Sequence, residues 1–217
     1  MKVGTDALVL ASLINTHGKL NCLDVGAGTG VIALILAQRF PLLQVDAVEK
    51  DSEAAKECET NFENSPWANR LASYEGDFLS FESNKSYDLI VSNPPYYTST
   101  LKNNNARKAN ARHVESLPPS LFVEKATNLL LPEGEFWIIV PSDDLENWLN
   151  VASDNGLDPF QIVDVFGKVG VLKRNVIGLK RNAKSCMRNT FTIRNESGQY
   201  SDQYILQTKE LHFNKLV

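Results

Sequence analysis

The stretch Asp24-Val25-Gly26-Ala27-Gly28-Thr29-Gly30 begins at the end of the apolar residues 20–25 and runs directly into the apolar residues 31–37. The shorter apolar run predicts a buried strand, and the longer one predicts the start of a helix. Three glycines between a strand and a helix N-terminus let the backbone approach a bound ligand closely. The sequence therefore predicts a strand-turn-helix unit with a ligand site at the turn.

The rest of the chain continues this alternation of strands and helices. We expect strands near residues 45–48, 71–74, 87–91 and 135–140, and helices near residues 51–64, 119–131 and 143–155. Ahead of the glycines, Thr5 or Asp6 is placed to cap a helix that ends near residue 15. Residues 160–166, 175–180, 190–194 and 204–208 are rich in β-branched and aromatic side chains and predict further strands. This order predicts one α/β domain with a mostly parallel sheet and an antiparallel edge strand.

Acidic residues follow the second and third predicted strands. Glu49 stands about twenty residues after the glycines, where an acid accepts hydrogen bonds from ribose hydroxyls. Asp77 is placed to accept a hydrogen bond from an adenine amino group, with Phe78 beside the adenine ring. The alternative for Asp77 is an ordinary turn-forming residue.

The prolines of Ser92-Asn93-Pro94-Pro95-Tyr96 end the buried strand 87–91. Asn93 offers a carbonyl acceptor and Pro94 keeps a free backbone carbonyl, so together they can accept both hydrogens of a planar amino group. Tyr96 is placed to stack on the ring that carries this group. The alternative is a proline-rich loop that only terminates a strand.

Composition argues against several classes of protein. The 217 residues are 43% hydrophobic and 22% charged, as in ordinary soluble domains. Cys22, Cys58 and Cys186 lie far apart, so we expect neither a zinc site nor a disulfide framework. We expect no signal peptide and no membrane-spanning run, and hence a cytoplasmic protein.

The charge is unevenly distributed along the chain. Residues 102–113 and 168–194 hold 12 of the 22 Lys and Arg residues and no acid, which leaves 10 basic residues against 26 acidic ones elsewhere, a balance of −16. Such segregation indicates a basic face for a polyanion such as RNA, and the alternative is a set of solvated strand edges. The residues expected to contact RNA are Lys102, Arg107, Lys108, Arg112, His113, Lys173, Arg174, Lys180 and Arg181.

Taken together, the motif Asp24-x-Gly26-x-Gly28-x-Gly30, Glu49 and Asn93-Pro94-Pro95-Tyr96 resemble the Rossmann-type, class I S-adenosylmethionine-dependent methyltransferases that act on amino groups. This similarity covers about residues 1–141. Met1-Lys2-Val3-Gly4-Thr5-Asp6 and Ala111-Arg112-His113 resemble one group more closely, the bacterial tRNA1(Val) adenine-37 N6-methyltransferases.

The resemblance implies a doubly wound, seven-stranded sheet, methyl transfer to N6 of a tRNA adenine, and a monomer without metal. It implies Asn93, Pro94, Pro95 and Tyr96 as catalytic residues. It implies that S-adenosylmethionine is bound by Lys2, Thr5, Asp24, Gly26, Gly28, Gly30, Glu49, Asp77, Phe78 and Asn93. Members of this group usually carry some twenty residues ahead of the segment at Met1, so a missing N-terminal segment is expected.

Three other functions remain open at the level of sequence. Protein glutamine methyltransferases of the release-factor type share the Asn-Pro-Pro-Tyr loop but usually carry an N-terminal helical domain. DNA adenine methyltransferases usually need a separate target-recognition domain, for which 217 residues leave no room. A non-catalytic RNA-binding relative would have no need of an intact Asn93 and glycine loop.

Overall fold

The computed structural model describes residues 4–15, 18–94 and 118–211. Within these ranges eight strands form one sheet in the order β3-β2-β1-β4-β5-β7-β6-β8. The strands are β1 (Asn21–Val25), β2 (Gln44–Glu49), β3 (Leu71–Glu75), β4 (Tyr87–Ser92), β5 (Leu130–Pro141), β6 (Asp158–Lys168), β7 (Val171–Lys180) and β8 (Met187–Thr192).

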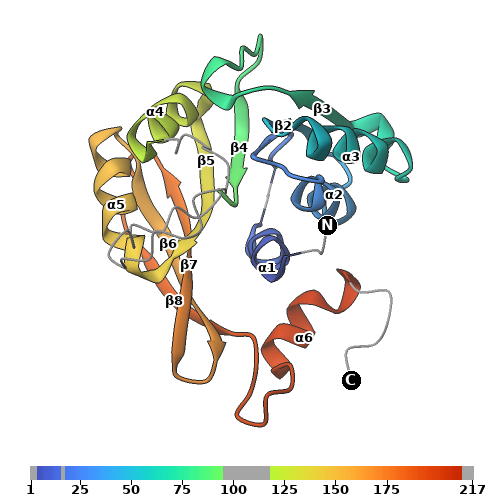
Figure 1. Ribbon diagram of the computed structural model, residues 1–217. Coiled ribbons are helices and arrows are strands. Elements are labelled where there is room, and N and C mark those ends of the chain that lie inside the picture. Colours follow the sequence, from blue (N-terminus) through green and yellow to red (C-terminus); the bar gives the residue numbers. More distant parts are fainter. Residues whose placement is uncertain (1–3, 16–17, 95–117, 212–217) are drawn as a thin grey trace, which may run out of the picture.

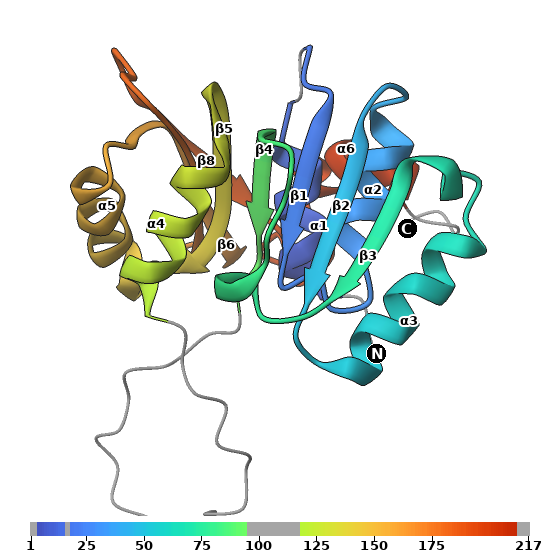
Figure 2. The same ribbon diagram turned by 90° about the horizontal axis from the view of Figure 1, so that it is seen from above.

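Helices cover both faces of this sheet (Figures 1 and 2). One core is built with α1 (Thr5–Leu13), α2 (Val31–Arg39), α3 (Ser52–Glu63) and α6 (Asp202–Thr208), and the other with α4 (Pro119–Leu129) and α5 (Leu145–Asp154). Short 3-10 turns are η1 (Ala68–Arg70), η2 (Phe78–Ser80), η3 (Ser142–Asp144) and η4 (Lys209–Leu211). The predicted α/β fold with helices on both sides is confirmed. Among the described helices, none combines the length and apolar character needed to cross a membrane.

Parallel pairing brings the ends of the first strands to one edge. Val25, the last residue of β1, lies opposite Val48 of β2 on one side and Ser92 of β4 on the other. Figure 2 shows the arrowheads of β1 to β4 at the same edge. The loops after these strands are therefore neighbours, which is the usual place for a site in an open α/β sheet.

The antiparallel strand does not lie at the edge of the sheet. β7 runs antiparallel to both β5 and β6 and lies between them, and β8 adds an eighth strand parallel to β6. The predictions of an antiparallel edge strand and of seven strands are therefore wrong. Apolar patterning identifies strands but carries little information about which distant strand each one pairs with.

Residues 204–208 form part of a helix, so the predicted strand is wrong. The Ser201 hydroxyl accepts a hydrogen bond from the Tyr204 N–H at 3.0 Å and caps α6. Asp202 adds an acid in the first turn, and Tyr204 and Thr208, one turn apart, are buried. The cap and this spacing outweigh the β propensity of the segment.

The first helix also starts differently from the prediction. Gly4 is the N-cap residue of α1 and no side chain caps the helix, so neither Thr5 nor Asp6 has the predicted capping role. The Asp6 carboxylate instead pairs with the Arg174 guanidinium, 2.9 Å from its Nε. This ion pair joins the first turn of α1 to the start of β7.

Arg181, which the sequence assigns to an RNA-binding face, has a structural role. Its guanidinium donates hydrogen bonds to the backbone oxygens of Thr127 and Leu131, at 2.7 and 2.8 Å. Thr127 lies in the last turn of α4, whose carbonyls have no partner within the helix. Arg181 therefore caps α4 at the point where the chain enters β5.

Replacing Arg181 with Ala is expected to lower the free energy of unfolding by about 1–3 kcal/mol, because two partly buried carbonyls lose a charged donor. Urea denaturation followed by circular dichroism measures the change. Lys184→Ala, at an exposed position three residues further along, is the control and should change stability by less than about 0.5 kcal/mol. Equal stability of the two variants would contradict the capping role.

Candidate active site

The glycine-rich turn after β1 has a backbone that few other residues tolerate. Gly26, Gly28 and Gly30 have φ values of 68°, 56° and 81°, all in the left-handed region. At Gly30 an added Cβ would lie 2.5 Å from Cε1 of Phe62 and 2.7 Å from Sγ of Cys58. Gly30 therefore lets α2 begin immediately after the turn while α3 packs against it.

Glu49 holds the glycine turn in place. Its Oε2 accepts a hydrogen bond from the Gly28 N–H at 2.7 Å, and its Oε1 accepts one from the Asp51 N–H at 2.8 Å. The backbone N–H groups of Gly26 and Ala27 donate to the Val48 oxygen at 2.9 and 3.2 Å. The end of β2 thus fixes the shape of the turn after β1, a role of Glu49 that its position in the sequence does not reveal.

Asp24 is a buried carboxylate of β1 that reaches the first turn of α2. Its Oδ2 accepts a hydrogen bond from the Ala33 N–H at 3.1 Å, and its Oδ1 has no partner in the described part of the chain. Burial raises the pKa of Asp24 from 3.8 to about 7; the Ala33 hydrogen bond lowers it and the charge of Glu49 raises it further. A buried acceptor without a partner indicates a place for a donor from a ligand or a water.

The Asn93 loop lies beside the glycine turn. Asn93 and Pro94 are half-buried at the end of β4. The hydroxyl of Ser92 is buried and donates a hydrogen bond to the Val25 oxygen at 2.8 Å, which ties the last residue of β4 to the last residue of β1. In the sequence, the only signal for this role of Ser92 is a hydroxyl at the last position of an apolar strand, and no such role is expected from it. Pro95 and Tyr96 lie outside the described residues.

Asp77 and Phe78 follow β3 at the same edge. Asp77 accepts hydrogen bonds from the Leu79 N–H at 2.9 Å and from the Lys50 ammonium at 2.8 Å. The Lys50 hydrogen bond first, and then the Leu79 N–H, lower the pKa of Asp77. The Phe78 ring is buried, with its centroid 5.1 Å from that of Phe122 on α4. The structure thus shows a turn-forming role for Asp77, while its contact with adenine stays a prediction.

The basic residues of β7 separate into two groups. Lys173 and Arg174 lie at the start of β7, next to the carboxyl end of β5, whereas Lys180 and Arg181 lie at its far end. The Lys180 ammonium lies over the Phe160 ring, 5.0 Å from its centroid. The four residues predicted to bind RNA therefore do not form one patch.

Of the remaining predicted site residues, Thr5 is the first residue of α1 and is exposed. Besides Pro95 and Tyr96, the predicted residues outside the described ranges are Lys2, Lys102, Arg107, Lys108, Arg112 and His113.

Comparison with known proteins agrees with this arrangement. Residues 2–175 match the methyltransferase small domain. The chain is 38% identical over 214 residues to a tRNA1(Val) (adenine(37)-N6)-methyltransferase of Flavobacterium psychrophilum, covering 96% of this chain and 91% of that one. An enzyme of the same name from Pectobacterium carotovorum is 33% identical over 216 residues, with 98% and 87% covered.

Solved structures of low sequence identity share the fold. A predicted O-methyltransferase from Agrobacterium tumefaciens superimposes with a TM-score of 0.72 at 14% identity, covering 94% of this chain and 96% of that one. A putative RNA methyltransferase from Pyrococcus horikoshii gives a TM-score of 0.56 at 18% identity, with 81% and 82% covered.

The sheet order, the glycine turn after β1 and the loop after β4 define a Rossmann-like methyltransferase fold, as the sequence predicts. Within that class, the chain belongs to the methyltransferase small domain family and, by its similarity over nearly its whole length, to the tRNA1(Val) (adenine(37)-N6)-methyltransferases. The resemblance read from the motifs is confirmed.

Replacing Asp24 with Asn is expected to change how stability depends on pH. The folded protein keeps the Asp24 proton up to a pH of about 7, whereas an ordinary Asp loses it near 3.8, so this group lowers the free energy of unfolding as pH rises between those values. Asn carries no titrating proton, so the free energy of unfolding of Asp24→Asn does not fall in this way. The difference in free energy of unfolding between the variant and the parent should therefore shift in favour of the variant by roughly 2–3 kcal/mol as the pH rises from 5 to 8. Urea denaturation across that range measures it, and parallel pH profiles would refute the shifted pKa.

Proposed function

We propose that the protein transfers a methyl group from S-adenosylmethionine to the exocyclic N6 of an adenine in tRNA, namely adenine 37 of tRNA1(Val). The observation that carries the proposal is the position of Asn93 and Pro94. They follow β4, whose last residue is hydrogen-bonded to the end of the strand that leads into the glycine turn. The names of the relatives supply the nucleic acid and the position.

The residues around the glycine turn fit the proposed cofactor. An added Cβ at Gly26 would meet no atom within 4 Å, so the turn is open there, and Asp24 Oδ1 offers a buried acceptor. In the proposal, Glu49, the last residue of β2, binds the ribose hydroxyls, and Asp77, two residues beyond β3, binds the adenine amino group. S-adenosylmethionine supplies an electrophilic methyl group on a sulfonium. We include Lys2, Thr5 and Phe78 in this set because the resemblance implies them.

The proposed chemistry needs an amino nitrogen whose lone pair is available. In adenine this lone pair is delocalised into the ring. When the Asn93 side-chain oxygen and the Pro94 carbonyl accept the two N–H groups, they favour rehybridisation of the nitrogen as the new bond forms. The nitrogen lone pair forms the N–C bond, the electrons of the C–S bond go to sulfur, and one N–H proton passes to water. Because water takes the proton, the reaction needs no side chain with a shifted pKa to act as a base.

Positioning supplies much of the remaining catalysis. Holding the nitrogen in line with the methyl carbon at about 3–3.5 Å can contribute on the order of 7–11 kcal/mol. An adenine in an anticodon loop is unpaired or easily splayed out, so moving it into the site costs little. Tyr96, two residues beyond Pro94, is the proposed stacking partner of the base.

The proposal is tested by incubating the protein with radiolabelled S-adenosylmethionine and separate pools of tRNA, rRNA, DNA and protein from cells that lack the activity. We expect label in tRNA and, after nuclease digestion, in N6-methyladenosine. Label in protein glutamine, or in no pool while the cofactor still binds, would overturn the proposal.

Replacing Glu49 with Ala is expected to weaken S-adenosylmethionine binding by roughly 1–3 kcal/mol, about 5- to 150-fold. The variant loses a charged acceptor and the hydrogen bond that shapes the turn at Gly28. Glu75→Ala is a matched control, because Glu75 lies opposite Glu49 at the end of β3 and is exposed. Calorimetry measures both affinities, and a normal affinity for Glu49→Ala would exclude this role.

Replacing Asn93 with Ala is expected to lower turnover about 100- to 1000-fold, because an acceptor for the reacting amino group is lost mainly in the transition state. Affinities for cofactor and RNA should stay within a few-fold of the parent. Asn93→Asp keeps an acceptor oxygen and should retain more activity than Asn93→Ala. An Asn93→Ala variant with nearly normal turnover would reduce the loop to a strand terminator.

A further inference from the structure

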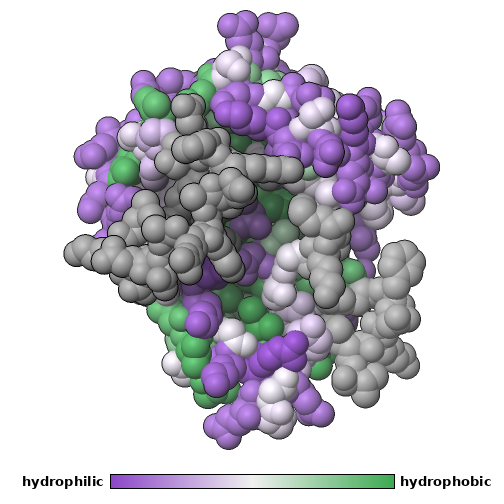
Figure 3. Space-filling view, viewed as in Figure 1, coloured by the Kyte–Doolittle hydropathy of each residue, from purple (hydrophilic) through white to green (hydrophobic). Residues whose placement is uncertain are grey.

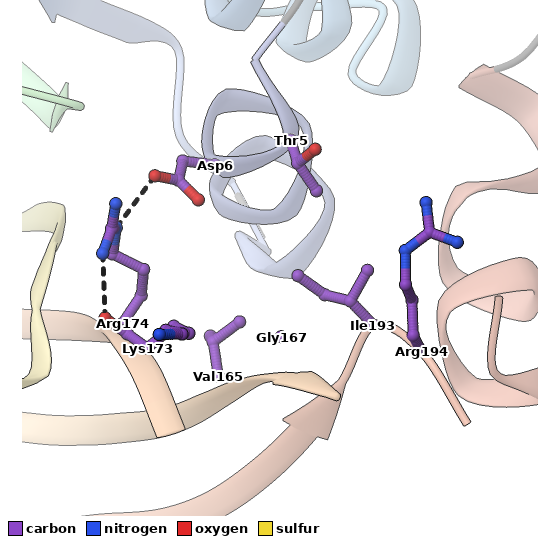
Figure 4. Close-up of a pocket in the computed structure, with 8 residues that line it drawn as sticks. All are labelled: Thr5, Asp6, Val165, Gly167, Lys173, Arg174, Ile193 and Arg194. Atoms are coloured by element: carbon purple, nitrogen blue, oxygen red, sulfur yellow. Dashed lines mark hydrogen bonds and ion pairs between the residues drawn. The ribbon is translucent and has the colours of Figure 1, made fainter. Parts of the chain in front are cut away.

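A groove lies between the first turn of α1 and the ends of β6 and β8. Its volume is about 270 Å³, and Figure 4 shows Thr5 and Asp6 on one side and Val165, Gly167 and Ile193 on the other. Lys173, Arg174 and Arg194 complete the lining. The space-filling view shows a small hydrophobic area bordered by hydrophilic residues below the centre of this face (Figure 3).

The groove carries an excess of positive charge. Its lining has three cations, Lys173, Arg174 and Arg194, and one carboxylate, Asp6, which gives a formal charge of +2. Asp6 pairs with Arg174, whose Nη1 also donates to the Lys173 backbone oxygen at 3.0 Å, so this guanidinium is held in place. Lys173 is exposed, and no acid of the described residues pairs with its ammonium. An anion would balance this excess.

Arg194 is also held in a fixed orientation. Its guanidinium donates to the Gly198 oxygen at 2.7 Å and stacks on the Tyr200 ring, with 4.6 Å between its central carbon and the ring centroid. Figure 4 shows Arg174 and Arg194 on opposite sides of the groove. Two guanidiniums fixed by neighbouring groups form a preorganised site, which lowers the entropy cost of binding an anion.

The groove lies on the substrate side of the proposed active site. Ser92, the last residue of β4, lies opposite Ile138 of β5. Ile138 lies opposite Ile177 of β7, which in turn lies opposite Ile162 of β6. β5, β7 and β6 continue several residues past the level of Ser92, as far as Pro141 on β5. With strands about 4.8 Å apart and about 3.3 Å per residue, the groove lies roughly 15–25 Å from the end of β4, with Arg174 at its nearer side.

We propose that this groove binds the phosphodiester backbone of the substrate RNA, a few nucleotides from the methylated base. The inference rests on the proposed function. Arg174 and Arg194 would contact phosphate oxygens from the two sides, and Lys173 would add a third cation at the rim. Thr5 and Asp6 of the first turn of α1, which no N-cap side chain caps, line the same groove. Arg194 ends the basic stretch 168–194, but neither Arg194 nor α1 is among the residues that the sequence analysis expects to contact RNA.

The test measures binding of a fluorescein-labelled, unmodified anticodon stem-loop of the substrate tRNA by anisotropy at 50–200 mM salt. The test variant is Lys173→Glu, which reverses one charge at the rim. The control is Lys184→Glu, which makes the same change at an exposed position beyond the far end of β7. Lys173→Arg keeps the charge, and cofactor affinity measured for every variant reports on folding.

We expect Lys173→Glu to weaken RNA binding at least about tenfold at 50 mM salt and to reduce the slope of log K against log salt by about 0.7–0.9 for each phosphate that the protein no longer neutralises. Lys184→Glu should bind within about twofold of the parent, and Lys173→Arg should match the parent.

If Lys173→Glu and Lys184→Glu lost RNA affinity equally, the groove proposal would be overturned, because the RNA would then respond only to the overall charge of the protein. A loss of cofactor affinity with RNA binding unchanged would also overturn it, because the anion would then be the carboxylate of the cofactor. The groove and the proposed function can fail independently of each other. If the parent and its variants bind RNA in the expected pattern but the parent methylates no RNA, the proposed function is refuted and the groove is supported.

Discussion

The left-handed backbone at Gly30 is the constraint on which the site depends. Because the turn has φ of 81° there and no side chain, α2 begins one residue later and packs closely against Phe62 and Cys58 of α3. Parallel pairing of β1 with β2 places the end of β2 next to the turn, where the Glu49 carboxylate accepts the Gly28 N–H. One residue without a Cβ thus sets the start of the helix, and the end of β2 fixes the shape of the edge on which a ligand would lie.

The buried Asp24 carboxyl beside the glycine turn lowers the stability of the fold and favours binding of a ligand. Burial raises the pKa of Asp24 to about 7, and one of its oxygens has no partner within the described chain. Burial of a polar atom without a partner costs free energy that an apolar residue would not cost. The proposed cofactor offers a reason to keep the carboxylate, since a donor that reaches Oδ1, directly or through water, recovers this cost only when it is bound.

The sequence predicts the parts of this molecule that depend on local patterns. The strand before Gly26, the helix after Gly30 and the loop at Asn93 follow from apolar runs, glycines and prolines, and all lie where these signals place them. The structural roles of Ser92, Glu49 and Arg181 depend on partners 21 to 67 residues away, which a linear pattern does not indicate. The helix at residues 202–208 was hidden because its aromatic and β-branched content masks the cap at Ser201.

The direction of β7 decides which charges face the site. In a parallel strand the last residues, Lys180 and Arg181, would lie at the carboxyl edge. Since β7 is antiparallel to β5, its first residues, Lys173 and Arg174, lie there instead. Lys180 then covers Phe160, and Arg181 caps α4. Counting basic residues along the chain cannot separate these roles, because the two pairs are only six residues apart and alike in composition. For a protein with a net charge of −4, RNA affinity would therefore depend on strand topology more than on the total number of cations.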